Sequence, residues 1–416
     1  MQTLNYDVVV VGAGSAGVAS ALASSRTGSK TLLVERKACF GGEATNSWVS
    51  AYCGFYTKGE VPTQCVKGIG DEVLTRLKEY GEDVNYVVNP STKNASVRFH
   101  PEVVKLVLDD MMMESSVDCR LCTSLIDVEV VDNKIVSVTI MDDEDKYKVY
   151  AKSFIDTTGD ANLIHLTNVE TMWGNEEFGI QQSSLSCLIE GVPKEEIKIE
   201  TLEAAIKKGK ENGIKYLDKE RGMIIKVKGD DYGYLTIPSV IIDNLSGEEL
   251  TLKHVELRRK ALAYAKTIKE YAEGFENTRL MATAPYIGIR ESRRMVGQTI
   301  IKGEDVLKAT KSTDTIARAG WPVEVHKLSG LEYHELKDND YYGIPLSALI
   351  SKDISNLFSA GRCISCDSIA LASLRVMGTS FATGQASGVA AAYYAKNGVI
   401  EVTEIQEILK QQNALI

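Results

Sequence analysis

A glycine-rich turn near the N-terminus carries the clearest chemical signal in the sequence. Residues 12–17 read Gly-Ala-Gly-Ser-Ala-Gly, which matches the spacing G-x-G-x-x-G. In this pattern the first glycine permits a tight turn, the second lets the backbone approach a pyrophosphate, and the third lets a helix pack against a strand. The helix N-terminus then offers free N–H groups and a partial positive charge to phosphates. The turn therefore predicts a dinucleotide site made by Gly12, Gly14, Ser15, Ala16 and Gly17.

An acidic residue stands where such a site needs one. Glu35 ends the aliphatic run Thr31 to Glu35, about 20 residues after the turn, and is placed to accept hydrogen bonds from a ribose. A glycine-rich turn alone can be purely structural, but the strand before it and the acid after it together favour nucleotide binding. An acid here favours an unphosphorylated ribose, so FAD and NAD are both candidates and NADP is disfavoured.

The segments around the turn predict the first half of a doubly wound α/β fold. Tyr6 to Val11 is typical of a buried parallel strand, Gly12 to Ser24 of a small-residue helix, and Thr31 to Glu35 of a second strand, which together make a β-α-β unit. The same kinds of pattern predict further elements: a helix from Pro101 to Met113, a hairpin from Leu125 to Ile140 turning at Asp132-Asn133, and a strand from Tyr150 to Ile155.

A change in amino-acid composition along the chain predicts an inserted domain. From about His165 to Arg279, helical stretches rich in lysine and glutamate alternate with short strands. The last part of the chain again has the composition of the first part, with a strand predicted from Asn356 to Ala360 and an alanine-rich helix from Thr379 to Ala395. We therefore expect a Rossmann-like α/β domain interrupted by an α+β cap, divided as residues 1–165, 166–284 and 285–416.

The bulk composition narrows the class of protein and its partners. The chain has 416 residues, a formal net charge of −10 and eight cysteines. Acidic charge disfavours nucleic acid and anionic lipid as partners, and every apolar run falls short of the roughly 20 residues of a membrane helix. Because no secretory signal is evident, the cysteines are expected to be reduced thiols. We expect a cytoplasmic enzyme, and no particular oligomeric state is predicted.

Several motifs together resemble one protein family. The chain is similar to the FAD-dependent oxidoreductases of the glutathione-reductase-like superfamily, and within it to the group related to the flavoprotein component of heterodisulfide reductase. The resemblance covers most of the chain and rests on Val8 to Gly17, Leu33 to Arg36 with Gly41-Gly42, Asp156 to Asp160, Gly288 to Arg294, Tyr342 to Pro345, Ala360 to Arg362, and Arg375 to Gly388. It favours FAD over NAD as the cofactor.

The resemblance also implies which part of FAD each of these segments would contact. The glycine-rich turn would hold the pyrophosphate, Glu35 the ribose, and the backbone at Leu125 the adenine. Thr158-Gly159 would cross beside the cofactor and Gly361-Arg362 would approach the pyrophosphate and ribityl chain. Gly378 and Thr379 would put backbone amides near N1 and the C2 carbonyl of the flavin. Arg36, Gly42 and Ala44 complete the set of expected cofactor residues.

The last helix has chemistry that suits a flavin independently of the resemblance. Reduced flavin carries negative charge at N1 and C2=O, and a helix N-terminus stabilises such charge. Thr379 and Ser380 stand ahead of the alanine run and are predicted to cap the helix. The alternative is a small-residue helix that only packs closely on its neighbours.

Three side chains are the candidates for catalysis. Arg290 belongs to the cluster Arg290 to Arg294, which can be an ion-paired helix start on the surface, or a set of guanidinium donors that clamp an anionic substrate or brace the flavin. His326 resembles a histidine found here in the family; it can move the proton that accompanies hydride transfer, or be structural. Arg375 precedes Gly378, and it can bind a substrate carboxylate, steady reduced flavin or make a plain salt bridge.

Other cysteine and metal chemistry is not expected. Glutathione-reductase-like disulfide enzymes carry two cysteines soon after the Gly-Gly pair, where this chain has Ala44 and Val49. The pair Cys119/Cys122 and the pair Cys363/Cys366 are expected to be structural, although the second pair follows the flavin-contacting turn. No histidine or cysteine spacing predicts a zinc or iron–sulfur site.

The sequence thus predicts a two-electron flavoprotein in which hydride passes between flavin N5 and a small, possibly anionic, molecule. Hydroxylation and halogenation are less expected, because their DG-type and G-W-x-W-x-I motifs are absent. No second G-x-G-x-x-G follows a strand, so electrons would come from substrate, from transiently bound NAD(P)H or from a protein partner. An electron-transfer protein without a substrate pocket and an NAD-dependent dehydrogenase are the alternatives.

Overall fold

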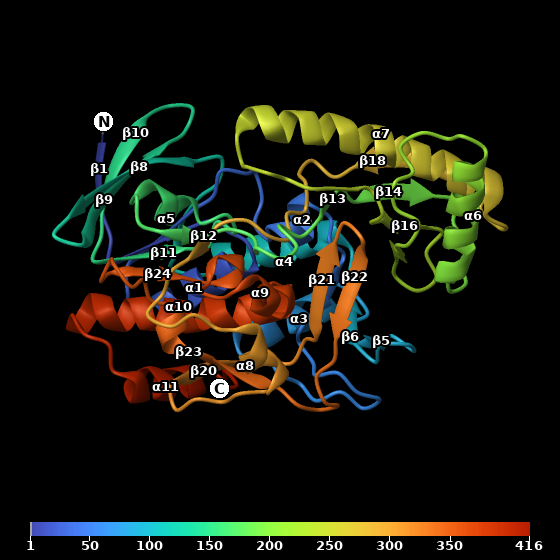
Figure 1. The fold of residues 1–416 in the computed structure, drawn as a ribbon. Helices are drawn as coiled ribbons and strands as arrows, with labels where there is room; N and C mark the ends of the chain where they lie inside the picture. The colour runs from blue at the N-terminus through green and yellow to red at the C-terminus, as the bar shows by residue number, and fades with distance from the viewer. Residues whose placement is uncertain (1) are drawn as a thin grey trace.

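A five-stranded parallel sheet lies at the centre of the fold. A computed structural model describes residues 2–416, and its strands β2 (Val8–Val11), β3 (Thr31–Val34), β7 (Asp118–Arg120), β11 (Ser153–Asp156) and β24 (Leu357–Ser359) form one sheet in the order β24-β11-β2-β3-β7. All four pairings are parallel. Strands β2, β3, β11 and β24 are buried along their whole length, and in β2 the unbroken run of valines predicts this. The end of the chain therefore completes a sheet that its beginning starts (Figure 1).

Two helices from opposite ends of the chain pack at very close range. Helix α1 (Ser15–Arg26) follows β2, and α10 (Met377–Asn397) lies beside it (Figure 1). A Cβ atom on Gly384 would lie 2.2 Å from the carbonyl oxygen of Ala16, and one on Gly388 would lie 2.2 Å from that of Ser20. Glycine at these positions is what lets the two backbones meet.

A second sheet of four strands, which includes the first strand of the chain, packs against the parallel sheet. Strands β8 (Ser124–Val131) and β9 (Lys134–Met141) form the predicted hairpin, and both turn residues, Asp132 and Asn133, have positive φ of 48° and 57°. This is the backbone of a tight two-residue turn, in which asparagine and aspartate are favoured. The sheet order is β1-β10-β9-β8, with β1 (Gln2–Asn5) parallel to β10 (Lys146–Tyr150).

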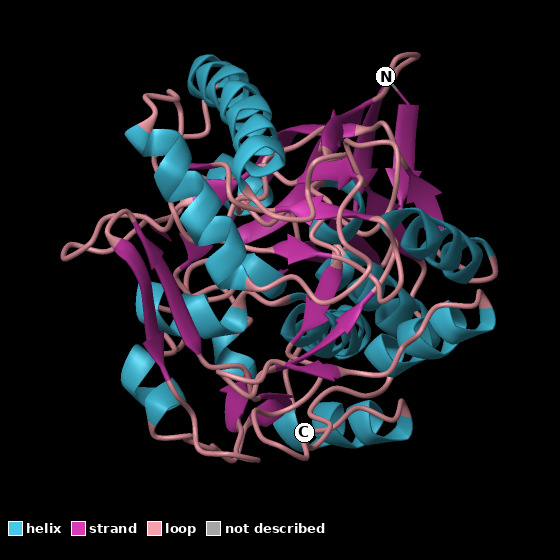
Figure 2. Cartoon of the chain, turned by 90° about the vertical axis from the view of Figure 1, so that its right-hand side faces the viewer, coloured by secondary structure: helices cyan, strands magenta, loops and turns pink. Residues whose placement is uncertain are grey.

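The inserted region forms a layer with its own core, which we call the cap. Its sheet has the order β15-β16-β14-β18, and it carries helices α6 (Ile199–Glu211) and α7 (Gly247–Tyr271) on the outside (Figures 1 and 2). Leu202, Ile206 and Tyr264 from the two helices are buried together against this sheet. The strands are β14 (Cys187–Glu190), β15 (Ile224–Ile225), β16 (Tyr232–Leu235) and β18 (Arg279–Thr283).

Short elements connect these layers. Helices α3 (Ile69–Glu79) and α4 (Pro101–Met113) pack near α1 and α10, and α11 (Val402–Gln411) packs on α10. Among residues 2–416 no helix is both long enough and apolar enough to span a bilayer. The other elements are α2 (Glu43–Asn46), β4 (Ala51–Cys53), β5 (Val87–Val88), β6 (Ala95–Arg98), α5 (Asn162–Leu166), β12 (Thr171–Met172), β13 (Ser183–Ser184), β17 (Ser239–Val240), β19 (Arg294–Met295), α8 (Gly303–Leu307), β20 (Thr315–Ala319), β21 (Val323–Lys327), β22 (Gly330–His334), β23 (Tyr342–Pro345), α9 (Ser368–Leu374), and the 3-10 turns Leu346–Ala348 and Gly361–Cys363.

Three local predictions were wrong. Helix α10 begins at Met377 and its N-cap is Val376, so Thr379 and Ser380 lie inside the first turn and do not cap it. The run Tyr150 to Ile155 is split, because Tyr150 ends β10 in one sheet while Ser153 starts β11 in the other. The Arg290 cluster does not begin a surface helix: it is irregular chain leading into β19, and Glu291 and Arg294 are buried.

A histidine connects the body to the cap. His100, at the N-terminus of α4, lies 2.7 Å through Nδ1 from Glu82 Oε1 and 2.9 Å through Nε2 from Asp230 Oδ2, which belongs to the cap loop before β16. Burial lowers the pKa of His100, but the hydrogen bonds to the two carboxylates outweigh it and raise that pKa above its usual value.

We expect His100→Gln to destabilise the protein in a pH-dependent way. A raised folded-state pKa means that the contribution is complete below the unfolded value of about 6.5 and is lost as the pH rises through the folded value. The ring is partly exposed, so the loss at low pH should be about 1 kcal/mol. Urea unfolding of both proteins from pH 5.5 to 9 measures it; a difference that is constant with pH would contradict the charged bridge.

Candidate functional site

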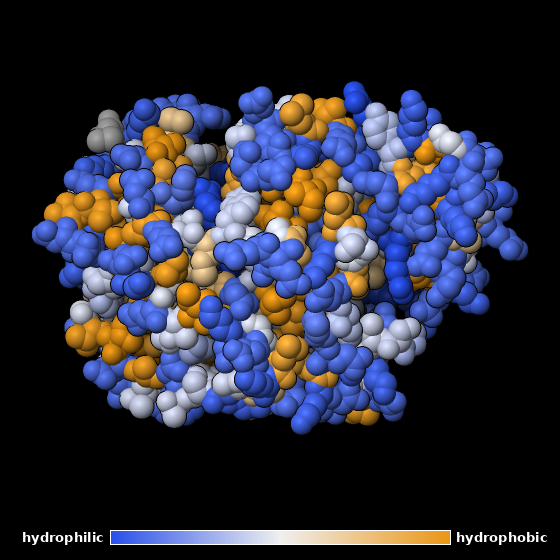
Figure 3. All heavy atoms as spheres, viewed as in Figure 1, coloured by the Kyte–Doolittle hydropathy of each residue, from blue (hydrophilic) through white to orange (hydrophobic). Residues whose placement is uncertain are grey.

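One large cavity runs from the glycine-rich turn to the cap. Its volume is about 2090 Å³, roughly twice the upper end of the usual 300–1,000 Å³ range for ligand pockets. The surface is hollowed where the cap meets the body, and the cap's outer face is largely hydrophilic (Figure 3). The cavity therefore has room for a dinucleotide and a second molecule.

The glycine-rich turn forms one end of this cavity. Gly12 has φ +99°, and a Cβ there would lie 2.6 Å from the carbonyl oxygen of Thr157, the residue after the neighbouring strand β11. A Cβ on Gly42 would lie 2.8 Å from the Cα of Gly14, so two backbones meet over the start of α1. Ser15 adds a buried hydroxyl without a hydrogen-bond partner. These features fit a cradle for a pyrophosphate, which needs backbone access and free donors.

Glu35 is positioned by the backbone on both sides. Its Oε2 accepts a hydrogen bond from the amide of Ala13 at 2.7 Å and its Oε1 one from the amide of Lys37 at 2.9 Å. The side chain lines the cavity. A carboxylate has about four acceptor sites, so hydroxyl donors of a ribose can still be accepted here.

Arg362 braces the strand ends beside the turn. Its guanidinium donates to the Ser292 hydroxyl at 2.8 Å and to Asp160 Oδ1 at 3.0 Å, and it lies 3.9 Å from Glu43. Ser292 in turn donates to the same oxygen of Asp160. The network fixes the loop 158–160, which lines the cavity across from the glycine-rich turn.

Most predicted cofactor residues line the cavity and four do not. Gly17 packs inside the turn, where a Cβ would lie 1.7 Å from the carbonyl oxygen of Gly12, and Ala44 is fully buried. Gly378 packs on the backbone of Gly54, and Thr379 is fully buried. At the start of α10 the lining residues are instead Val376, Met377 and Ser380. Those that do line it are Gly12, Gly14, Ser15, Ala16, Glu35, Arg36, Gly42, Leu125, Thr158, Gly159, Gly361 and Arg362.

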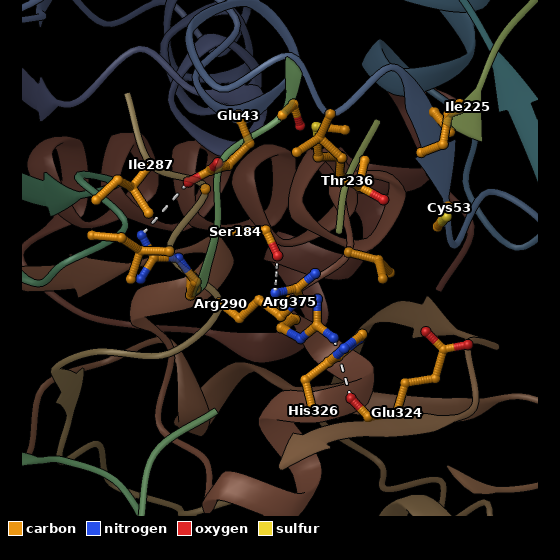
Figure 4. Close-up of a pocket in the computed structure, with 18 of the residues that line it drawn as sticks. Glu43, Cys53, Ser184, Ile225, Thr236, Ile287, Arg290, Glu324, His326 and Arg375 are labelled. Atoms are coloured by element: carbon orange, nitrogen blue, oxygen red, sulfur yellow. Dashed lines mark hydrogen bonds and ion pairs between the residues drawn. The ribbon is translucent and has the colours of Figure 1, made fainter. Parts of the chain in front are cut away.

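The three predicted catalytic residues meet in one chamber of the cavity. Arg290, from the chain before β19, donates through Nη1 to the carbonyl of Gln182 at 2.6 Å and to the Ser184 hydroxyl at 2.7 Å. Arg375, after α9, donates through Nη2 to the carbonyl of Glu324 at 3.2 Å, and its Nε is buried without a partner. His326 lies on β21 beside both guanidinium groups (Figure 4).

The charges in the chamber are not balanced. Within residues 2–416, neither Arg290 nor Arg375 has a carboxylate oxygen within 4.0 Å. Burial, and then the charge of Arg375, lowers the pKa of Arg290 to about 9; burial also lowers that of Arg375, against the pull of Glu324. An uncompensated pair of buried cations favours an anionic ligand.

His326 is held neutral by the same surroundings. Burial, and then the positive charges of Arg290 and Arg375, keeps the pKa of His326 well below its usual value. A neutral imidazole can accept a proton as well as return one. The carboxylate of Glu324 also lines the chamber, and burial raises its pKa while Arg375 opposes the rise. Glu43 is a further carboxylate at the cavity, and it lies 3.9 Å from Arg362.

The two arginines at the ends of the cluster, Arg290 and Arg294, lie in different environments. Arg290 faces the chamber, whereas Arg294 forms a fully buried ion pair with Glu291 at 2.7 Å, with side-chain exposures of 2% and 0%. Arg294 also donates to the carbonyl of Cys366 at 2.8 Å and to the Ser368 hydroxyl at 3.2 Å. The pair joins this segment to the start of α9.

The four cysteines of the two C-x-x-C pairs do not line the cavity, whereas Cys53 does. Cys363 and Cys366 are buried, and burial raises both pKa values, that of Cys366 to about 12. Burial also raises the pKa of Cys119, to about 11. These three thiols are therefore protonated at neutral pH, which supports a structural interpretation. Across residues 2–416 the fold gathers no group of three or more potential metal ligands.

Two lining residues had no usable sequence signal. Lys219 and Gln182 lie in the cap and the segment leading to it, where no motif distinguishes them from their polar neighbours. Only the folding of the cap over the sheet brings them to the chamber.

The chain belongs to the family described as FAD dependent oxidoreductase, whose family description matches residues 7–412. It is thus a flavoenzyme fold with FAD as cofactor and oxidation–reduction as its class of reaction.

Two solved structures with a TM-score of 0.50 show the same fold at low sequence identity, and a third is similar to this chain at a lower score. The flavin-dependent brominase Bmp2 matches with a TM-score of 0.50 and 14% identity, covering 98% of this chain and 84% of that one. BexE, studied for oxidation during BE-7585A biosynthesis, matches with a TM-score of 0.50 and 12% identity, covering 98% of this chain and 66% of that one. A geranylgeranyl bacteriochlorophyll reductase-like protein from Thermoplasma acidophilum matches with a TM-score of 0.49 and 15% identity, over 99% and 83%.

Proposed function

We propose that this flavoenzyme oxidises or reduces a small organic anion by two-electron transfer. The observation that carries the proposal is the chamber beside the dinucleotide cradle, in which no carboxylate oxygen of residues 2–416 lies within 4.0 Å of Arg290 or Arg375. A planar guanidinium binds a carboxylate through two parallel N–H groups, and two of them fix its orientation. A protein that only carried electrons would have no use for such a chamber.

The cofactor would be held by the residues that line the rest of the cavity. The backbone at Gly12, Gly14 and Ser15 would bind the pyrophosphate, and Glu35 the ribose. Leu125 would lie at the adenine, and Val376 to Ser380 would lie at the flavin end, where the N-terminus of α10 suits negative charge. When bound, FAD supplies hydride-transfer chemistry at its isoalloxazine ring.

The side chains of the chamber would position the substrate and move the proton. Arg290 and Arg375 would bind the carboxylate and orient the reacting carbon. His326, kept neutral by burial and by the two arginines, would accept the proton of a substrate O–H or N–H group in the oxidative direction and return it in the reductive one. The hydride and this proton together account for both hydrogens of the two-electron step.

We also propose the finer placement of the chain. The motif pieces Gly41-Gly42 and Ala360 to Arg362 support the group related to the flavoprotein component of heterodisulfide reductase, with transiently bound NAD(P)H or a protein as electron partner. The divisions 1–165, 166–284 and 285–416 would be the two parts of the FAD domain and the cap between them. All eight cysteines are free, which supports a reducing, cytoplasmic location.

The test is anaerobic bleaching of the flavin by a panel of hydroxy, amino and unsaturated carboxylic acids and their methyl esters. We expect acids to bleach it and their esters not to. Arg290→Met should weaken binding of the active acid about 10- to 100-fold, the usual effect of losing a charged hydrogen bond. Arg259→Met, an exposed arginine on α7, is the control. Equal activity of esters, or an unaffected Arg290→Met enzyme, would sink the proposal.

A further inference from the structure

A lysine of the cap lines the same cavity as the two arginines. Lys219 lies in the loop between α6 and β15 and lines the cavity together with Arg290 and His326. Its positive charge is among the influences that lower the pKa of His326, after burial and the two arginines. Three cations from three separate segments therefore act on one imidazole.

The loop that carries Lys219 is firmly held. The phenol of Tyr264, on α7, accepts a hydrogen bond from the amide of Lys219 at 2.8 Å and donates one to its carbonyl at 2.7 Å. Tyr264 is itself fully buried in the cap core. The backbone at this position is thus fixed from both sides, and its side chain is presented from a rigid base.

The carboxylate of Asp218, the residue before Lys219, is paired with a different lysine. Asp218 accepts a hydrogen bond from the ammonium of Lys260 at 2.7 Å, and Lys260, buried on α7, also lies 2.7 Å from Glu256. Lys219 itself has no carboxylate oxygen within 4.0 Å in the part of the chain that the structure describes. Burial, and then the charge of Arg290, lowers its pKa to about 8, while Asp218 opposes the change. The ammonium group therefore lacks a counter-charge of its own.

The charge count of the chamber sets the class of ligand. Arg290, Arg375 and Lys219 are the cations, and the carboxylate of Glu324 lines the chamber near them. Glu43 and Asp218 also line the cavity, but Glu43 lies 3.9 Å from Arg362 and Asp218 accepts a hydrogen bond from Lys260. Two positive charges remain, and a ligand with two negative charges would neutralise them. A single carboxylate can occupy the two guanidinium groups but leaves the cap lysine unpaired.

We propose that Lys219 binds a second carboxylate of the substrate, so that the substrate is a dicarboxylate held between the two arginines of the body and the lysine of the cap. The inference rests on the proposed function, since it takes the arginine pair as the site of the first carboxylate. It also makes the cap part of substrate recognition, because the second carboxylate is bound by a cap residue.

Isothermal titration calorimetry of the holoenzyme tests this with unreactive ligands at constant ionic strength. Succinate and glutarate are compared with butyrate and valerate, which have the same chain lengths and one carboxylate. We expect the better dicarboxylate to bind at least tenfold more tightly than its monocarboxylate. Lys219→Met should remove that preference, a loss of about 10- to 100-fold for the dicarboxylate with little change for the monocarboxylate. The control is Lys266→Met, which removes one exposed cap charge outside the chamber.

The pH dependence gives a second readout. The groups that act on Lys219 are Arg290, Asp218 and, across the chamber, His326. The ratio of dicarboxylate to monocarboxylate affinity should fall as the pH rises from 7 to 9.5 and the free ammonium loses its proton, because a change at Arg290, whose pKa is about 9, would affect both ligands. In Lys219→Arg, which keeps its charge over that range, the fall should be much smaller, and dicarboxylate binding should be retained.

The outcomes separate this inference from the proposed function. Binding of monocarboxylates that depends on Arg290, without any preference for dicarboxylates, would overturn the role of Lys219 and leave the anion site standing. A preference that survives Lys219→Met would equally overturn it. If neither kind of carboxylate binds, or binding ignores Arg290→Met, both proposals fail together.

Discussion

Replacing Arg294 by methionine is expected to lower the free energy of unfolding by about 3–5 kcal/mol. The change leaves the carboxylate of Glu291 buried without its counter-charge and removes the donors to Cys366 and Ser368. A lone buried charge is far more costly than the buried pair is stabilising. Urea unfolding followed by circular dichroism and flavin fluorescence measures the loss, which should appear in both signals.

The matched experiment is the double variant Glu291→Leu/Arg294→Met. With both charges gone, much of the lost stability should return, so the coupling energy between the two sites should be large and favourable. The pair Glu304–Lys308, whose side chains are both 69% exposed, supplies the control, because breaking it should change nothing measurable. A double variant as unstable as the sum of the two singles would show that the ion pair is not what these residues contribute.

Gly384→Ala is expected to cost about 2–3 kcal/mol and to lower the FAD content of purified protein. Its Cβ would lie 2.2 Å from the carbonyl oxygen of Ala16, so α1 and α10 must separate. The N-terminus of α1 is also the proposed pyrophosphate cradle, which therefore shifts with the helix. Thermal unfolding and the ratio of flavin to protein absorbance check the two effects.

A second glycine variant controls for the change in backbone freedom. Gly247 is the first residue of α7, and a Cβ there meets nothing within 4 Å. Gly247→Ala should be neutral or stabilising by up to about 1 kcal/mol, since alanine is the better helix former. If Gly384→Ala were as harmless as Gly247→Ala, the close helix contact would not be a structural requirement.

The parts of the fold that the sequence predicted best are those set by local pattern. The helix Pro101–Met113 was predicted at the residues where it lies, and the hairpin at Asp132-Asn133 follows from the turn chemistry of those two residues. The run Tyr150 to Ile155 was predicted as one strand, because two strands of different sheets follow each other there with only two residues between them. Apolar pattern alone gives no signal for a change of sheet.

The candidate site was predictable only where a motif marked it. Arg290, His326 and Arg375 were found from charge, titration chemistry and resemblance, and all three line the chamber. Gly378 and Thr379 lie in the first turn of α10, as expected, but the helix starts two residues before Thr379, so its N-cap is Val376 and not one of the polar residues. The burial of Glu291 with Arg294 and the approach of Lys219 depend on tertiary packing, which a charge cluster in a sequence does not reveal.

The late arrival of β24 has a consequence for how the chain is made. This strand pairs with β11, yet the ribosome needs roughly 10–40 s, at about 5–20 residues per second, to synthesise the stretch between them. During that interval the nascent β11 presents an unpaired edge, a known hazard for association between chains. FAD can bind only after nearly the whole polypeptide has been synthesised. A chain that ends before β24 would therefore lack bound flavin and would be prone to aggregate through the exposed edge of β11.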